Sequence, residues 1–219
     1  CQIVKGFAYS KDGMHAWNLV KLDDAGHHLL DLINEVLDMS RMEKGQYALE
    51  ENEFDIEQVL SECMEVVKGD FSEKNHIISL NFQGLKHRDV IADIEKVRKV
   101  FENILSNAMK FTPNGGKISI NLKDEMNRLP EYSTFEFTVE DDGIGMSDEF
   151  QRHMFEPFSR EQVSLDASSD GMGLGLAITK NLVHLMDGNV FVKSRSKEGT
   201  SITVTLVLKT SAGSRRCSA

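Results

Sequence analysis

The region from residue 55 to residue 208 alternates between segments with the apolar period of a helix and segments with that of a strand. After a short extended stretch, Asp55 is a capping residue for the first of these helices. Helices are predicted at 55–74, 93–112, in a short segment after Ser147, and at 173–186. Strands are predicted near 76–82, 88–92, 117–123, 134–140, 189–194 and 200–208. This mixture predicts an α+β fold, a two-layer α/β sandwich.

A long helix is predicted upstream of this region, over residues 14–44. Leu22, Leu29 and Val36 recur every seven residues, and this spacing gives an apolar seam suited to a helical bundle or coiled coil. A surface helix packed on its own domain is the alternative. The length of the seam favours the bundle.

Composition narrows the functional class. The 219 residues carry a formal net charge of −10, which argues against nucleic-acid binding because a nucleic-acid surface needs clustered Lys and Arg. No apolar run approaches the ~20 residues that span a bilayer, so we expect no membrane contact from this chain, although a parent protein could be membrane-anchored. Cys1, Cys63 and Cys217 fit neither a metal nor a disulfide pattern. A reducing cytoplasm is therefore the expected compartment.

The predicted helix over 93–112 has one polar face with a possible chemical role. Asn103, Asn107 and Lys110 fall within ~60° of one another on a helical wheel, opposite an apolar face. An amide oxygen is a suitable ligand for Mg²⁺, and a lysine can neutralise phosphate. A plain solvated helix face explains the same pattern, so both interpretations stay open at this point.

A second candidate follows a predicted strand, in the sequence Asp141-Asp-Gly143-Ile-Gly145-Met146. Two glycines two residues apart allow the backbone to turn tightly and approach a ligand closely. A carboxylate at the strand end can accept a hydrogen bond from an exocyclic amine such as that of adenine. An acidic turn is the alternative, while the ligand spacing of a calcium loop is absent.

The third candidate is the glycine-rich turn Gly171-Met-Gly173-Leu174-Gly175, which opens a predicted helix. Backbone N–H groups at a helix N-terminus attract anions. The pattern alone is weak, because it is neither a dinucleotide-binding fingerprint nor a P-loop. The polar segment 159–170 before it, with Arg160, is a candidate lid over phosphates.

Taken in order, these motifs resemble the conserved boxes of sensor histidine kinases. The matching segments are Asn103-xxx-Asn107-Ala-Met-Lys-Phe-Thr, Asp141-x-Gly-x-Gly, Phe155-Glu-Pro-Phe158, the glycine turn and Gly199-Thr200. The segment from His28 to Gly45 resembles the second helix of that family's dimerisation domain. Phe155–Phe158 and the bundle helix distinguish the chain from the related chaperone, gyrase and mismatch-repair ATPases. The resemblance implies a Bergerat-type ATP-binding fold preceded by a long bundle helix.

The resemblance also implies a role for each matched residue. Asn107, helped by Asn103, would bind Mg²⁺, and Lys110 would touch phosphate. The adenine pocket would be formed by Phe111, Asp141, Gly143, Gly145, Met146 and Thr200. The phosphates would be surrounded by Gly171, Gly173, Leu174 and Gly175, and Arg160 would be a further phosphate contact. The implied cofactors are ATP and Mg²⁺. The implied partners are a second copy through the N-terminal helix and a response regulator receiver domain.

The phosphoacceptor pattern of the family is the one part without a match. That pattern resembles S-H-E-x-R-x-P-L, whereas the only prolines here are Pro113, Pro130 and Pro157. His15, His27 and His28 lack such a context and are expected to be helix-surface residues. We therefore expect residues 1–45 to be a partial dimerisation domain, 46–210 the catalytic domain and 211–219 a disordered tail. Such a chain, alone, is not expected to autophosphorylate.

Two other functions stay open from the sequence. A scaffold that has lost kinase activity would keep the fold, but the complete set of nucleotide motifs argues against it. A chaperone-type ATPase would need a carboxylate where Asn103 stands, and an amide is a poor general base. Glu102 is adjacent but points about 100° away on the helix.

Overall fold

The computed structural model describes residues 26, 30, 33, 36, 37, 48–129, 131–161 and 172–211. The chain divides into two units, Cys1–Tyr47 and Ala48–Ala219. In the first unit the five described residues, Gly26, Leu30, Ile33, Val36 and Leu37, are helical and exposed. The remainder of the helix predicted over 14–44 lies outside the described residues, as do residues 212–219.

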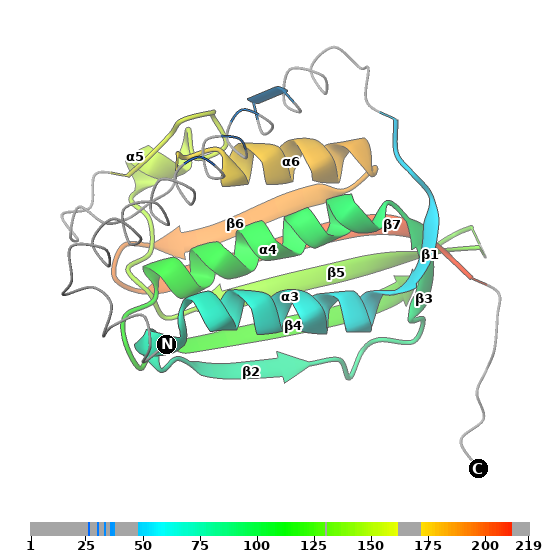
Figure 1. Cartoon of the computed structure of the whole chain (residues 1–219), viewed down its shortest axis with the longest axis horizontal. Coiled ribbons are helices and arrows are strands. Elements are labelled where there is room, and N and C mark those ends of the chain that lie inside the picture. The colour runs from blue at the N-terminus through cyan, green and yellow to red at the C-terminus, as the bar shows by residue number, and fades with distance from the viewer. Residues whose placement is uncertain are drawn as a thin grey trace, which may run out of the picture. The chain divides into compact units, whose positions relative to one another are not determined.

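The second unit is a sheet covered on one face by helices (Figure 1). Its strands are β1 (Asn52–Asp55), β2 (Ile77–Asn81), β3 (Asp89–Ala92), β4 (Lys117–Met126), β5 (Tyr132–Asp141), β6 (Asn189–Arg195) and β7 (Gly199–Thr210). Its helices are α3 (Ile56–Asp70), the 3₁₀ turn η1 (Ser72–Lys74), α4 (Ile94–Phe111), α5 (Asp148–Gln151) and α6 (Gly175–Leu185). The two-layer sandwich expected from the sequence is confirmed.

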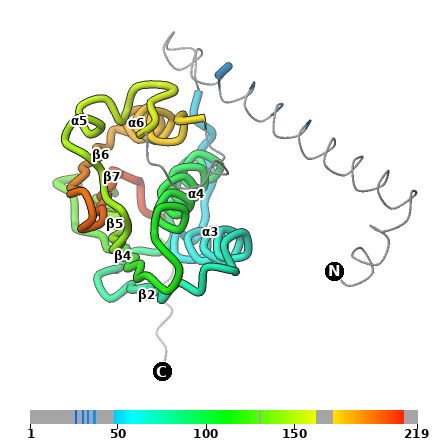
Figure 2. The backbone as a smooth tube through the Cα atoms, turned by 90° about the vertical axis from the view of Figure 1, so that its left-hand side faces the viewer, coloured from blue at the N-terminus to red at the C-terminus, as the bar shows by residue number. Residues whose placement is uncertain are grey.

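The strands run in the order β1-β3-β7-β5-β4-β2, and β6 also pairs with β7. The pair β2–β4 is parallel, and the other pairs are antiparallel. Figure 2 shows α3, α4 and α6 together on one side of the sheet. The alternation of buried and half-exposed residues along β4, β5 and β7 follows from this one-sided cover.

The core lies between the sheet and the three long helices. Phe101 of α4 packs on Phe137 of β5, with ring centroids 4.6 Å apart, and both side chains are almost fully buried. α4 begins at its cap, Asp93, whose side chain accepts from the backbone N–H of Lys96 and of Glu50. Burial of this kind of apolar surface supplies most of the stability of such a layer pair.

Two helix boundaries differ from the prediction. α3 ends at Asp70 instead of Lys74. The separate 3₁₀ turn η1 follows it, before Asn75, which adopts a positive φ of 50°. α6 begins at Gly175 instead of Gly173, because Gly173 has a φ of 72°, which an α-helix does not allow. Across the described ranges, no helix is both long and apolar enough to cross a membrane.

Candidate functional site

The predicted site residues include members of four elements, β5, β7, α4 and α6. Asp141 ends β5 and is paired with Thr200 at the start of β7. Asn103, Asn107 and Lys110 lie on α4, the central helix of the layer in Figure 1. Gly175 opens α6, which packs beside α4. The structure thus brings together ends of strands and helices that lie up to about a hundred residues apart in the sequence.

Asp141 is a half-buried carboxylate held by backbone donors. The N–H of Gly143 donates to its Oδ1 at 2.9 Å, and the backbone N–H of Thr200 also donates to this carboxylate. Burial raises the pKa of Asp141, an effect that these two donors oppose and the nearby charge of Asp142 reinforces. The carboxylate is therefore fixed in position and only partly compensated, as expected of a group that meets a ligand.

The glycines after Asp141 allow backbone segments to touch. A Cβ on Gly143 would lie 2.6 Å from the carbonyl oxygen of Phe111, at the end of α4. Gly145 has a φ of 63°, and a Cβ there would lie 1.8 Å from the carbonyl oxygen of Arg195. The loop is therefore clamped between α4 and the β6–β7 turn, and the N–H of Ile144 donates to the Phe111 carbonyl at 3.2 Å.

Met146 follows these glycines and is half-buried. Its backbone N–H donates to the Oγ of Ser194 at 2.8 Å. Ser194 lies on β6, outside every predicted motif, and its hydroxyl also contacts Thr200 Oγ1 at 2.9 Å. Only the pairing of β6 with β7 brings it there, so no local pattern identified it.

On α4, the structure separates the roles of the two asparagines. Asn103 Nδ2 donates to the carbonyl oxygen of Gly175 at 3.2 Å and to Thr179 Oγ1 at 3.4 Å. Its amide nitrogen thus ties α4 to the first turn of α6. Asn107, one turn further on, is half-buried. The sequence pattern did not foresee this use of Asn103.

The end of α4 carries Lys110 and Phe111. The ammonium of Lys110 lies 5.4 Å from the centroid of the Phe111 ring, and this ring is 40% exposed. Such a contact is within the range of a cation–π interaction. An exposed aromatic ring beside a lysine forms a surface on which a flat, electron-rich group can lie.

A lysine outside the predicted motifs supports this end of α4. Lys74 Nζ donates to the carbonyl oxygens of Met109 at 3.1 Å, Lys110 at 2.5 Å and Thr112 at 3.2 Å. A cation at the C-terminus of a helix satisfies its unpaired carbonyls and its dipole. Lys74 follows α3 by only a few residues, and its sequence context gives no sign of this contact with α4.

The glycine turn before α6 is strained in a way that suits glycine alone. A Cβ on Gly173 would lie 2.4 Å from the carbonyl oxygen of Ser159. Leu174 is buried and occupies the N-cap position, and no described side chain caps the helix. The first N–H groups of α6 are thus available to an anion.

Two predicted phosphate contacts have less structural support. Gly171 lies outside the described residues. Arg160 is exposed, next to the last described residue before the gap at 162–171. The part of the lid predicted at 159–170 that can be described is therefore limited to its first three residues.

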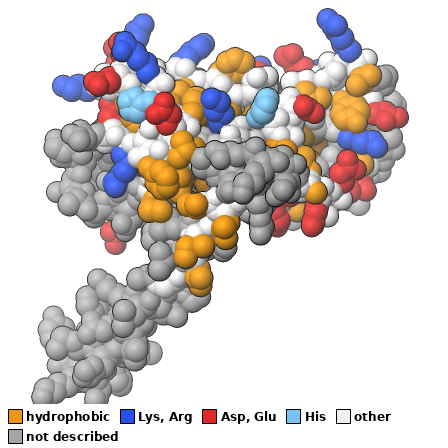
Figure 3. Space-filling model, turned by 90° about the horizontal axis from the view of Figure 1, so that it is seen from above, with side chains coloured by type: hydrophobic (Ala, Val, Ile, Leu, Met, Phe, Trp, Pro, Cys, Tyr) orange, Lys and Arg blue, Asp and Glu red, His pale blue; other side chains and the backbone are white. Residues whose placement is uncertain are grey.

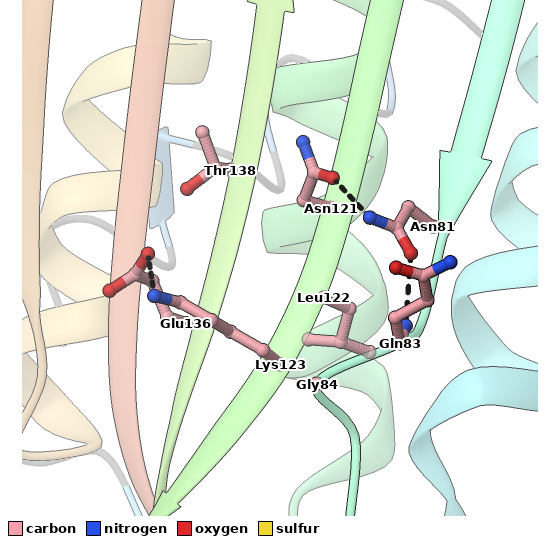
Figure 4. Close-up of a pocket in the computed structure, with 8 residues that line it drawn as sticks. All are labelled: Asn81, Gln83, Gly84, Asn121, Leu122, Lys123, Glu136 and Thr138. Atoms are coloured by element: carbon pink, nitrogen blue, oxygen red, sulfur yellow. Dashed lines mark hydrogen bonds and ion pairs between the residues drawn. The ribbon is translucent and has the colours of Figure 1, made fainter.

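A separate hollow of about 290 Å³ lies on the opposite face of the sheet (Figure 4). Its polar side chains pair with one another: Asn81 donates to Asn121 at 3.1 Å, and Lys123 lies 3.1 Å from Glu136. It contains none of the predicted site residues. The face seen in Figure 3 intersperses hydrophobic side chains with charges of both signs.

Comparisons with known proteins identify the family of this chain. Residues 92–210 match the family described as histidine kinase-, DNA gyrase B-, and HSP90-like ATPase. The chain is 33% identical over 188 residues to the non-motile and phage-resistance protein of Caulobacter vibrioides, covering 86% of the chain and 22% of that protein. It is also 33% identical over 184 residues to the circadian input-output histidine kinase CikA of Synechococcus elongatus, covering 84% of the chain and 24% of CikA.

Solved structures show the same relationship. Full-length ShkA, crystallised with AMPPNP, superimposes with a TM-score of 0.73 at 27% identity, covering 90% of this chain and 40% of ShkA. The mycobacterial sensor histidine kinase MprB gives a TM-score of 0.58 at 25% identity, covering 74% of this chain and all of that one. The chain spans less than a quarter of the length of the two curated relatives named above. The chain therefore belongs to the histidine kinase-, DNA gyrase B- and HSP90-like ATPase family, and within it to the sensor histidine kinases.

Proposed function

We propose that the site between Asp141, α4 and the start of α6 binds ATP with Mg²⁺ and donates the γ-phosphoryl group to a histidine. The observation that carries this proposal is the pairing of a fixed carboxylate with an uncapped helix end. Asp141 offers an acceptor to the exocyclic amine of adenine. The N–H groups at the start of α6, beside Gly173 and Leu174, offer donors to phosphate.

The residues around Asn107 fit a magnesium ion. Mg²⁺ takes oxygen ligands and usually keeps several waters alongside phosphate oxygens. The described residues contain no cluster of three or more His, Cys, Asp and Glu that could hold a metal by themselves. A site made of the amide oxygens of Asn107 and Asn103 and the phosphates is consistent with this. The bound ion would neutralise charge on the phosphates.

The surroundings favour phosphoryl transfer over ATP hydrolysis. Hydrolysis needs a general base to activate water. The amide of Asn103 is engaged with α6. Glu102 faces α3, where its charge and, above all, burial raise the pKa of the Cys63 thiol to about 11. Neither side chain supplies a base at the site, so this chain acts by positioning the nucleotide.

The remaining assignments extend the same proposal. Residues 1–45 would be part of a dimerisation domain, with the acceptor histidine on a bundle helix outside these 219 residues. A second copy would pair through the seam that contains Val36, and a response regulator receiver domain in the cytoplasm would accept the phosphoryl group. Sedimentation velocity tests the pairing: the mass should rise with concentration, and Val36→Glu should abolish the rise. A concentration-independent monomer would contradict it.

The nucleotide proposal is tested by calorimetry with ADP in the presence of Mg²⁺ or of a chelator. We expect Mg²⁺ to strengthen ADP binding and Asn107→Ala to remove that gain. Asn121→Ala is the matched control, because Asn121 is also half-buried but lies on the opposite face of the sheet. Absence of ADP binding to the unaltered chain, or an equal effect of the two substitutions, would refute the assignment.

A further inference from the structure

Three polar side chains form a row across the strands that end at the candidate site. Asp141 of β5 faces Thr200 of β7, and Thr200 faces Ser194 of β6. Residues directly opposite each other in antiparallel strands project to the same face. For this row it is the helix-covered face, since the residues two positions away from Thr200 and Asp141, Ile202 and Val139, are buried in the core.

The hydrogen bonds of Ser194 determine which way the Thr200 hydroxyl points. Ser194 Oγ lies 2.8 Å from the Met146 backbone nitrogen, 3.0 Å from the Gly199 carbonyl oxygen and 2.9 Å from Thr200 Oγ1. A hydroxyl has one proton and two lone pairs. The Gly199 carbonyl can only accept, so it takes the Ser194 proton. The Met146 N–H can only donate, so it takes one lone pair.

The contact between the two hydroxyls must therefore use the proton of Thr200. With that proton committed to Ser194, Thr200 Oγ1 has only lone pairs left for a ligand. The ionised carboxylate of Asp141, its neighbour in the row, is also an acceptor only. The end of the sheet thus presents two adjacent acceptors.

We infer that Ser194 is a specificity-determining residue that makes the site prefer a base with a 6-amino group over a base with a 6-oxo group. Two acceptors stabilise an N–H donor, whether it belongs to the base or to a bridging water, and they repel a carbonyl oxygen. Adenine carries the amine, and hypoxanthine and guanine carry the carbonyl. Ser194 acts on the base through Thr200 and is a positioning residue. This inference rests on the proposed nucleotide site, because it requires the base to lie at Asp141 and Thr200.

The test compares Mg·ADP with Mg·IDP, in which a 6-oxo group and a proton on N1 replace the 6-amino group of the base. The quantity measured is the ratio of their dissociation constants by calorimetry. We expect the unaltered chain to prefer ADP and Ser194→Ala to reduce that preference about tenfold, the scale of one hydrogen bond. In a Thr200→Val background, Ser194→Ala should leave the ratio unchanged. Ser201→Ala is the matched control, because Ser201 is next to Thr200 but projects to the other face, where it donates to Glu140.

Two results would overturn the inference. One is an equal loss of ADP and IDP affinity in Ser194→Ala, which would limit Ser194 to holding Met146. The other is a change of the ratio in the Thr200→Val background. If Ser194→Ala unfolds in a thermal melt, Ser194→Cys replaces it, since a thiol keeps the packing but hydrogen-bonds weakly. Failure of the unaltered chain to bind ADP would instead refute the proposed function and is distinguishable from both results.

Discussion

Replacement of Asp141 by asparagine is the sharpest single test of the candidate site. Asparagine preserves the shape of the side chain and one oxygen, so the hydrogen bond from the Gly143 N–H can persist. The second oxygen becomes an NH₂ group. This group would face the amine of adenine with donors instead of an acceptor. The substitution therefore changes the chemistry of recognition with little change in volume.

The expected loss follows from the state of the carboxylate. A hydrogen bond to a charged group contributes about 1.5–3 kcal/mol, which corresponds to a loss of affinity of about 10- to 150-fold. Asp141 is half-buried and already accepts two backbone N–H donors. We expect a value inside this range, because partial burial strengthens the contact while the two existing donors reduce the charge that remains.

The pH dependence gives a second, independent readout. Burial raises the pKa of Asp141 above its ordinary value near 3.8. The carboxylate therefore becomes protonated at a higher pH than a free aspartate does. ADP affinity of the unaltered chain should fall as the pH decreases through this raised pKa, and Asp141→Asn should remove that part of the dependence.

Calorimetry with ADP at neutral and at mildly acidic pH measures both effects. Glu140→Gln is the matched control, because it removes a negative charge one residue away on the exposed face of β5. Glu140→Gln should keep the ADP affinity within about twofold of that of the unaltered chain, since a surface charge contributes little to binding. Equal ADP affinity in the unaltered chain and in Asp141→Asn at neutral pH would refute the assignment of Asp141 to the base.

Further predictions concern the surroundings of the site. Lys74→Met should lower the free energy of unfolding by about 1–3 kcal/mol and weaken ADP binding, because three carbonyls at the end of α4 lose their donor. Lys74→Arg should restore part of the stability and part of the ADP affinity. A denaturant midpoint of Lys74→Met equal to that of the unaltered chain would contradict this. Asp124 is buried, which by itself raises its pKa, but hydrogen bonds from His87 and from the N–H groups of Lys86 and His87 lower it overall. Its contribution to stability should therefore be present above pH ~4, be lost as the pH falls through the lowered pKa, and vanish from acid-unfolding curves of Asp124→Asn. Incubation with labelled ATP should leave the chain without acid-labile phosphate, and stoichiometric label on His27 or His28 would show that one of them is an acceptor.

The elements of the sandwich were predictable where local signals agree. α4 begins after a capping Asp93 and keeps its apolar residues on one face, so a single segment specifies both its start and its orientation. The alternation along β5 and β7 identifies their buried faces in the same way. The order of motifs made Asp141 and Asn107 candidate site residues, because they occupy fixed places within short patterns.

The contacts that support the site were not predictable from any local pattern. Lys74 reaches the end of α4 across about 35 residues, and Ser194 reaches Met146 across 48 residues. Neither residue type is unusual for its own element. Their roles exist only because the strand order brings β6 beside β7 and η1 beside the end of α4. Asn103 shows the same limit, since its hydrogen bonds to α6 depend on how two helices pack.

The position of the candidate site follows from where the fold leaves polar groups only partly hydrogen-bonded. In the middle of the sheet and along the outer face, polar groups pair with one another, as Asn81 does with Asn121. At the end of β5 and the start of α6 the pairing is incomplete: two backbone N–H groups only partly compensate the half-buried carboxylate of Asp141, and no described side chain caps the first N–H groups of α6. Groups of opposite kind, an acceptor and a set of donors, are left at two places that α4 connects. A ligand with an amine at one end and phosphates at the other would satisfy both, which is why we propose a nucleotide at this end of the sandwich and not in the self-paired hollow on the other face.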